Sequence, residues 1–291
     1  MSETNPTSSP AWNDQLLQNP HAVADKRSRV QKMFANIAPS YDLNNRLHSL
    51  WMDQRWRRKA VKLAGLKPTD QIVDVASGTG DLAFAFAEVL GEICRGNRGE
   101  SNQVGMNDPL PTPVMGIDFT FEMLLRAQTK TPDWWFPFYR DEKDQPVLGD
   151  TWFPCAQFVN GDAQGLPLSD QSADVVSIAF GIRNVQDVPT ALKEFHRVLR
   201  PGGRVIVLEF SLPTNRILRG LYNFYFRQIL PRTATLISGD KTGAYKYLPE
   251  SVNTFIGREQ MVQMMGDAGL VEVEQFPMTF GVCVCYRGRK A

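Results

Sequence analysis

The sequence has few residues of the kinds that build metal centres or disulfides. Its 291 residues include only three histidines, and Cys94, Cys155, Cys283 and Cys285 lack metal-ligand spacing. We therefore expect no metal site and reduced thiols, as in a cytosolic protein.

The chain also lacks an excess of charge of either sign. Lys and Arg total 32 and Asp and Glu total 31, so the net charge of +1 indicates no nucleic-acid partner. Residues 1–10 are rich in Ser, Thr and Pro without an apolar core, which excludes a signal peptide or a membrane span there. We expect residues 1–27 to be a disordered tail and the location to be cytoplasmic.

The hydrophobic content of 43% is ample for a packed core. We expect one domain over residues 28–291, with two insertions. The first, at about 91–113, is polar and rich in Gly, Asn and Pro, and the second, at about 131–154, is aromatic and loop-like.

A β-branched apolar run at residues 72–75 is followed by a turn containing Gly78 and Gly80, and then by an alanine-rich segment. This order predicts a strand, a tight loop and a helix whose first N–H groups are free to bind a ligand. The same turn also occurs as a plain tight connection. Here, however, Asp74 and Asp81 flank it, and their charges disfavour a phosphate.

The turn also lacks the third glycine of dinucleotide sites and the Gly-Lys-Ser/Thr of nucleotide triphosphatases. A ligand that carries an ammonium or sulfonium group as well as a carboxylate fits the mixed polarity better. We therefore expect S-adenosyl-L-methionine to bind here, in contact with Asp74, Gly78 and Gly80.

Acidic residues follow the next two expected strands. Asp118 ends the strand at 114–117 and can accept both ribose hydroxyls; it lies 38 residues after Gly80 instead of about 20, because the first insertion intervenes. Its alternative role is to cap the helix at 119–127. Asp162 follows the strand at 156–159 and is placed beside the adenine, with the N–H of Ala163 directed at the ring.

A fourth apolar strand at 174–179 ends in Arg183 and Asn184. Ligands of open α/β sheets bind outside the carboxyl ends of the strands, so these two residues are the leading candidates for chemistry. A structural salt bridge is the alternative role of Arg183. Further strands at 204–210, 271–275 and 279–287 complete an expected seven-stranded, mostly parallel sheet with helices on both faces and a C-terminal antiparallel strand.

Two segments leave their partners open. Residues 215–237 are more aromatic than one helix face requires, so they could cover a core, bind an apolar substrate or touch a bilayer surface. A helix expected from 43 to 64 carries a basic face, for which a solvated surface is favoured over contact with anionic lipid. The face consists of Arg55, Arg57, Arg58, Lys59 and Lys62.

Several motifs resemble the quinone C-methyltransferases of menaquinone and ubiquinone biosynthesis. The resemblance begins at Met33-Phe34 and Tyr41-Asp42-Leu43-x-Asn45-Arg46-Leu47 and covers roughly residues 28–290 apart from the insertions. Two of its blocks indicate only a class I, Rossmann-like methyltransferase, and the other two narrow it to this family. In that order, the blocks are Asp74-Val-Ala-x-Gly-Thr-Gly-Asp81, Arg197-Val-Leu-x-Pro-Gly-Gly203, Phe180-Gly-Ile-Arg-Asn-Val185 and Tyr245-x-Tyr-Leu-Pro-Glu-Ser251.

The resemblance implies methylation of a ring carbon of a polyprenylated hydroquinone by S-adenosylmethionine. Demethylmenaquinol is the favoured acceptor. The alternatives are the benzoquinol step of ubiquinone biosynthesis, another small apolar acceptor and a non-catalytic scaffold. A polyprenyl substrate implies peripheral contact with the inner face of a membrane, and a homo-oligomer is left open.

The resemblance also implies roles for individual residues. Thr79, Asp118, Asp162 and Ala163 are expected to contact the cofactor, and Tyr41 to close over it. Ala179 stands where the family often has a small hydroxyl residue, which removes one hydrogen bond to the cofactor.

For the reaction, we expect Arg183 to stabilise the developing phenolate, while Asn184 and Tyr247 or Tyr245 orient the ring. Glu250 is the alternative base, and Tyr245, Glu250 and Ser251 are the expected substrate contacts.

Overall fold

The structure is a computed structural model that describes residues 11–96, 113–131, 138–140, 146–148, 156–240 and 242–291. Its centre is a seven-stranded sheet of order β5-β2-β1-β6-β7-β9-β8, in which β9 is antiparallel to both neighbours and the other pairs are parallel. This confirms the expected class I, Rossmann-like fold. The strands are β1 (Ile72–Val75), β2 (Val114–Asp118), β5 (Ala156–Asn160), β6 (Ala173–Ala179), β7 (Leu199–Phe210), β8 (Leu270–Met278) and β9 (Cys283–Lys290).

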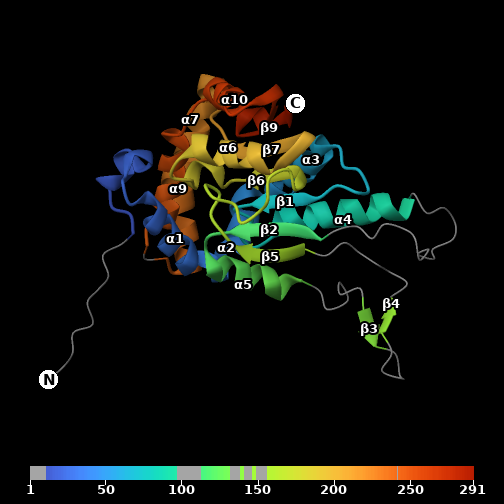
Figure 1. Cartoon of the computed structure of the whole chain (residues 1–291). Coiled ribbons are helices and arrows are strands. Elements are labelled where there is room, and N and C mark those ends of the chain that lie inside the picture. The colour runs from blue at the N-terminus through green and yellow to red at the C-terminus, as the bar shows by residue number, and fades with distance from the viewer. Residues whose placement is uncertain (1–10, 97–112, 132–137, 141–145, 149–155, 241) are drawn as a thin grey trace.

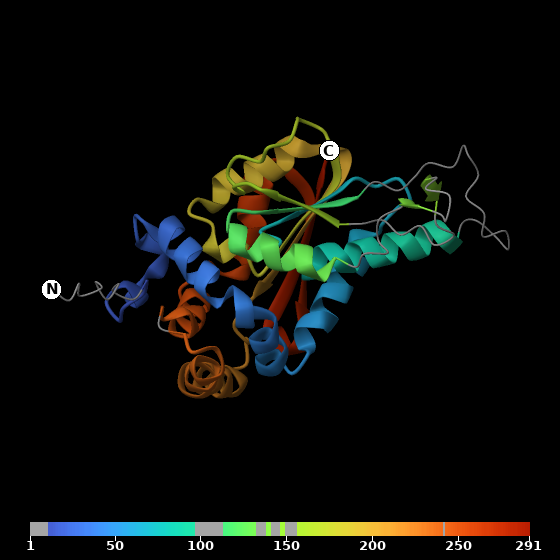
Figure 2. The same ribbon diagram turned by 90° about the horizontal axis from the view of Figure 1, so that it is seen from below.

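Helices cover both faces of the sheet (Figures 1 and 2). On one face, Trp56 and Phe86 pack into a cluster with the buried side chains of β1, β6 and β7. On the other, Phe195 and Met261 do the same. The first face is covered by α3 (Met52–Ala64) and α4 (Asp81–Gly96), and the second by α6 (Val188–Val198) and α10 (Arg258–Asp267).

A layer of further helices lies over the carboxyl ends of the strands, at the left of Figure 1. Its interior is a third apolar cluster, which includes Met33, Tyr222 and Tyr247. The layer and its flank consist of α1 (Lys26–Ile37), α2 (Tyr41–Ser49), α5 (Phe121–Lys130), α7 (Arg216–Phe224), the π-turn η6 (Tyr225–Ile229), α8 (Leu230–Ser238) and α9 (Ala244–Asn253). Within the described residues, no helix combines the length and apolarity that a membrane span requires.

The helix expected from 43 to 64 is two helices. Leu50 and Trp51 both have left-handed backbone, with φ of 51° and 59°, and this turn separates α2 from α3. The apolar spacing passes unbroken through the turn, so periodicity could not detect it. The expected basic face also loses Arg57, which is buried and paired with Asp53 at 2.7 Å.

The N-terminal segment and the insertions also differ from expectation. Residues 11–27, assigned to the disordered tail, contain the short turns Leu16–Gln18 and Pro20–Ala22, and Trp12 is only 2% exposed. The first insertion begins later than 91, because α4 continues to Gly96. The second contains an antiparallel pair, β3 (Phe138–Arg140) and β4 (Pro146–Leu148). Residues 1–10, 97–112, 132–137, 141–145 and 149–155 lie outside the described residues.

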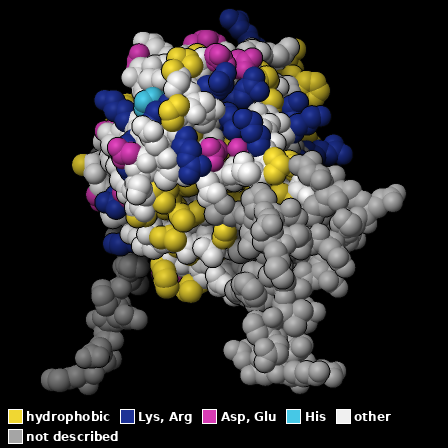
Figure 3. All heavy atoms as spheres, turned by 45° about the vertical axis from the view of Figure 1, so that its right-hand side comes forward, with side chains coloured by type: hydrophobic (Ala, Val, Ile, Leu, Met, Phe, Trp, Pro, Cys, Tyr) yellow, Lys and Arg dark blue, Asp and Glu magenta, His cyan; other side chains and the backbone are white. Residues whose placement is uncertain are grey.

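The surface is not uniform despite the near balance of charges. On the face shown in Figure 3, Lys and Arg side chains gather over the upper half, and hydrophobic side chains lie in patches beside and below them. Local fields and contacts therefore matter more here than net charge.

Candidate active site

Two chambers lie side by side between the sheet and the helical layer. The first has a cavity volume of about 60 Å³ and lies at the carboxyl ends of β1, β2, β5 and β6. Most of the residues expected to bind the cofactor line it, namely Tyr41, Gly78, Asp118, Asp162, Ala163 and Ala179. We call it the donor chamber.

Asp118 braces the glycine loop. The N–H of Gly78 donates to its Oδ2 at 2.8 Å, and the N–H of Thr120 donates to its Oδ1 at 2.7 Å. Burial raises the pKa of Asp118 to about 6, although these backbone donors favour its charged form. Thr120 precedes α5, so Asp118 holds the start of that helix as well as lining the chamber.

Asp74, Thr79 and Gly80 do not line the donor chamber, in contrast to expectation. Asp74 is 1% exposed and accepts from Ser177 Oγ at 2.7 Å, and burial raises its pKa to about 7. Its Oδ2 has no hydrogen-bond partner among the described residues. The Thr79 hydroxyl donates to Asp42 on α2 at 2.5 Å. Asp74 therefore contacts the sheet beside β6, whereas Thr79 joins the loop to α2.

Gly80 has a steric reason to be glycine. Its φ is 83°, and a Cβ there would lie 2.6 Å from the ring of Phe158. The glycine spacing of the loop therefore records the packing of the loop against β5 as well as ligand access.

The second chamber is larger, with a cavity volume of about 400 Å³, and its lining is mostly apolar. Tyr222, Tyr225 and Phe226 contribute to it from the aromatic-rich segment, as do Tyr245 and Tyr247 from α9. Polar groups are few and include Arg57 and Arg183. We call it the acceptor chamber.

The two chambers share a wall formed by Phe34, Tyr41 and Phe180. Phe180 has a φ of 55°, which is strained for an aromatic residue and is held by the surrounding packing. The next residue, Gly181, has no room for a side chain, because a Cβ would lie 2.6 Å from that of Ala76.

Arg183 lines the acceptor chamber and also forms the buried ion pair considered as its alternative role. One of its terminal nitrogens lies 2.6 Å from Glu209 Oε1 and donates to the carbonyl of Phe180 at 2.6 Å. The guanidinium lies 5.3 Å from the ring centre of Phe210. Glu209 is 1% exposed, so each charge depends on the other.

A hydrogen bond joins the two chambers. The hydroxyl of Tyr247, which lines the acceptor chamber, donates to Asn184 Oδ1 at 2.9 Å, and Asn184 lines the donor chamber. Trp12 stacks on the ring of Tyr247, with ring centres 4.4 Å apart. Burial raises the pKa of Tyr247 above its ordinary value.

Of the three expected substrate contacts, one lines the acceptor chamber. Tyr245 lines the acceptor chamber, whereas Glu250 and Ser251 do not. Glu250 points away from it and pairs with Arg227 at 2.9 Å, because its position in α9 falls on the opposite face of the helix. Ser251 is fully buried and accepts from Arg183 Nε at 3.4 Å.

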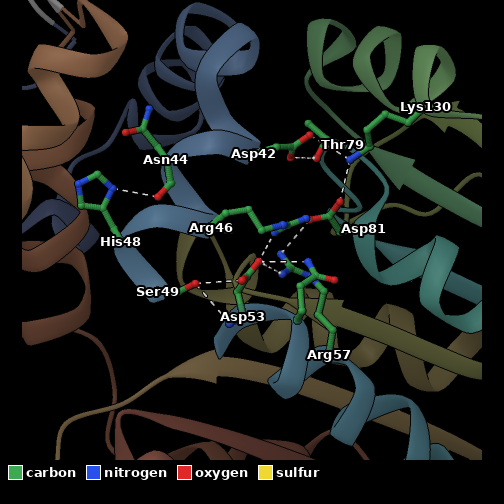
Figure 4. Close-up of polar contacts among 11 residues, drawn as sticks. Asp42, Asn44, Arg46, His48, Ser49, Asp53, Arg57, Thr79, Asp81 and Lys130 are labelled. Carbon is green, nitrogen blue, oxygen red and sulfur yellow. Dashed lines mark hydrogen bonds and ion pairs between the residues drawn. The ribbon is translucent and has the colours of Figure 1, made fainter. Parts of the chain in front are cut away.

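A cluster of charges ties α2 and α3 to the glycine loop (Figure 4). Arg46 lies between Asp53 and Asp81 and donates to Asp81 at 2.6 Å. Lys130 donates to Asp81 at 2.7 Å and to Asp42 at 3.0 Å. Burial opposes the charge of Asp81, but Arg57, Lys130 and Arg46 outweigh it and lower its pKa to about 2. Asp81 is therefore neutralised by protein cations.

Some lining residues were not predicted. Arg27 lines the donor chamber and pairs with Asp162 at 2.8 Å, and Trp56 and Phe180 line the acceptor chamber. Phe180 was within a quoted motif without an assigned role. Arg27 lay in the segment assigned to the disordered tail, so no sequence signal pointed to it.

Comparison with known proteins agrees with this arrangement. Among curated relatives, the ubiquinone/menaquinone biosynthesis C-methyltransferase UbiE of Geobacter sp. (strain M21) is 37% identical over 93% of this chain and 100% of its own. The demethylmenaquinone methyltransferase of Chlorobaculum tepidum is 35% identical over 91% and 93%.

Solved structures share the fold at lower identity. A methyltransferase of Thermotoga maritima, described as a possible histamine N-methyltransferase, has a TM-score of 0.52 and 19% identity over 90% of this chain and 100% of its own. The model of the ubiE/COQ5 methyltransferase family matches residues 22–290. The chain belongs to the ubiE/COQ5 methyltransferase family.

Proposed function

We propose that the protein transfers a methyl group from S-adenosylmethionine to a ring carbon of a polyprenylated hydroquinone, with demethylmenaquinol as the favoured acceptor. The observation that carries the proposal is the pair of chambers with one aromatic wall, Phe34, Tyr41 and Phe180. One chamber offers carboxylates suited to an adenosine. The other is a mostly apolar cavity of about 400 Å³, which suits an aromatic ring and the first part of a prenyl tail.

The residues of the donor chamber fit S-adenosylmethionine. Asp118 would accept hydrogen bonds from the ribose hydroxyls. Asp162 would accept from the exocyclic amine of the adenine, and the N–H of Ala163 would donate to the adenine ring. Asp74 lies in β1 and does not line the chamber, so it would act on the donor only through the loop. The bound donor would supply an electrophilic methyl group.

Arg183 and the Tyr247–Asn184 pair are placed to act on the acceptor. A phenol loses its proton more readily beside a fixed guanidinium, which makes the ortho carbon nucleophilic. Two short bonds hold Arg183 in place, so it would act as a fixed charge. The Tyr247–Asn184 hydrogen bond fixes side chains on both sides of the wall and would orient the ring.

Positioning is expected to contribute more than proton transfer. Alignment of two bound reactants supplies about 7–11 kcal/mol, whereas a general base contributes about 10²–10⁴-fold in rate. Glu250 does not line the acceptor chamber, so its position gives no support to the alternative base considered above. We therefore expect graded losses of rate in single variants.

Incubation with methyl-labelled S-adenosylmethionine and a demethylated quinol extract tests the proposal. Label in the naphthoquinone fraction is the expected result. Label in a benzoquinone would support the other step, label in another lipid would indicate a different acceptor, and no label would indicate a scaffold. Tyr247→Phe should lower turnover more than the affinity for S-adenosylmethionine. Tyr225→Phe serves as its matched control, because the Tyr225 hydroxyl donates to the carbonyl of His48 at 3.2 Å and not to Asn184.

A further inference from the structure

Several of the elements that line the acceptor chamber, or adjoin its lining, carry exposed large apolar side chains. Leu50 lines the chamber and is 77% exposed, so it lies at an opening. Neighbouring exposed residues come from the turn before α3, from one stripe of α7 and from the turn after β8. We call this set, at 58–82% exposed, the rim: Leu50, Trp51, Ile217, Leu221, Phe224 and Phe280.

The rim is held rigidly although it faces solvent. Leu50, Trp51 and Phe280 all have positive φ, of 51°, 59° and 56°, which costs free energy for residues with side chains. Trp56 Nε1 donates to Thr279 Oγ1 at 2.8 Å and so ties the two turns together. Because these side chains are exposed, their burial within the protein does not offset the free-energy cost of the strained backbone.

The apolar face of α7 points toward solvent instead of toward the protein core. Ile217, Leu221 and Phe224 are spaced i, i+4 and i+7 and point outward, whereas Tyr222 is buried beneath them. A helix with its apolar face in solvent requires a partner for that face.

Basic residues outnumber acidic ones in the segments that carry the rim, although Arg227 pairs with Glu250 of α9 at 2.9 Å. Residues 216–238, which form α7, η6 and α8, contain four arginines and no Asp or Glu. On α3, Arg55, Arg58, Lys59 and Lys62 are exposed, while the single acid, Asp53, is buried. An apolar rim within a cationic border matches a bilayer that carries anionic headgroups.

We propose that the rim docks on an anionic lipid bilayer, with its apolar side chains at the boundary between headgroups and acyl chains. The acceptor chamber then opens directly into the lipid, and a prenylated quinol enters it without exposing its tail to water. This proposal rests on the proposed function for the identity of the substrate. The surface itself is defined independently by exposure and charge.

Vesicle co-sedimentation tests the docking. The wild type should bind vesicles of phosphatidylcholine with phosphatidylglycerol more tightly than vesicles of phosphatidylcholine alone, and added salt should weaken the binding. Leu221→Ser with Phe224→Ser should weaken it at least about tenfold, since affinity scales with inserted apolar area. Val271→Ser, 42% exposed and at the amino end of β8 away from both chambers, should bind as the wild type.

Charge variants provide an independent measurement. Arg216→Gln should reduce affinity for the anionic vesicles about fivefold, from about 1 kcal/mol per basic residue at such a surface. The proposal would be overturned if the Arg216 variant and the Leu221/Phe224 variant both bound anionic vesicles as tightly as the wild type. So would a wild-type dimer in solution that the Leu221/Phe224 variant abolishes, because a second copy would then cover the rim.

Methylation of a quinol with one or two prenyl units, supplied in solution, separates the two proposals. Leu221 and Phe224 do not line either chamber, so their variant should methylate this substrate at the wild-type rate. Failure of the wild type to methylate it would contradict the proposed function. Methylation without vesicle binding would contradict only the docking.

Discussion

Replacement of Arg183 should lower the free energy of unfolding of the protein, apart from any effect on catalysis. Arg183→Met leaves Glu209, 1% exposed, as an uncompensated buried carboxylate beside Phe180 and Phe210. Breaking a buried pair in this way costs about 3–5 kcal/mol of unfolding free energy. For a chain of this size that corresponds to a fall of about 6–20 °C in the midpoint of thermal unfolding.

The double variant Arg183→Met with Glu209→Gln should recover most of the lost stability, because neither charge remains buried alone. Thermal and urea unfolding of wild type, both single variants and the double variant form the necessary cycle. Arg289→Gln is the matched control, since Arg289 pairs with Glu272 at 3.0 Å on the surface, and it should cost less than about 1 kcal/mol. A double variant as unstable as Arg183→Met would refute the ion-pair account.

The same double variant separates folding from catalysis. If the guanidinium stabilises the phenolate, the folded double variant should lose about 10²–10⁴-fold in turnover while it retains S-adenosylmethionine binding. Wild-type turnover in a stable double variant would show that Arg183 is only structural.

Three further changes are expected to have measurable effects. Ribose hydroxyls donate to ionised Asp118 and so lower its pKa of about 6, and the affinity for S-adenosylmethionine should therefore rise from pH 5 to 7 with proton release. Calorimetry of Asp118→Asn should show a smaller pH dependence of the affinity. The part that remains is owed to Asp74, whose pKa is about 7. Gly181→Ala should lower both donor affinity and stability, because its Cβ would lie 2.6 Å from that of Ala76; fluorescence titration that gives wild-type affinity would contradict this. Trp12→Ala should cost about 3–5 kcal/mol in chemical unfolding, and an unchanged midpoint would mean that the stacking on Tyr247 contributes nothing.

The fold could be predicted because its signals are local. The central strands β1, β6 and β7 each contain an apolar run, and the acids at the ends of β2 and β5 mark the end of the sheet where ligands bind. The turn at Leu50 and Trp51 was missed because two residues of ordinary helical type adopt left-handed backbone there, and only tertiary contacts select that conformation. The order of residues 11–27 was missed for a related reason. Trp12 is buried by α9, which lies more than 230 residues away in sequence.

The sequence predicted which loops form the site, but it did not predict which residues of each motif line the chambers. Asp118 and Asp162 line the donor chamber because a residue at the end of a parallel strand has only one edge to occupy. Asp74 and Thr79 belong to the glycine-loop motif, yet Asp74 contacts Ser177 and Thr79 contacts Asp42 instead of lining the chamber. Glu250 lies in a family motif, but one motif on a helix supplies residues to several faces, and sequence alone did not identify which face lines the chamber.

The wall between the chambers has a kinetic consequence. Arg27, with its side chain 60% exposed, borders the donor chamber, whereas Leu50 borders the acceptor chamber, so each chamber reaches the surface by its own route. A spent donor can leave while the prenyl tail stays bound, and neither ligand blocks the other. We therefore expect random-order addition through a ternary complex, in which initial-rate lines for one substrate at fixed concentrations of the other intersect instead of running parallel.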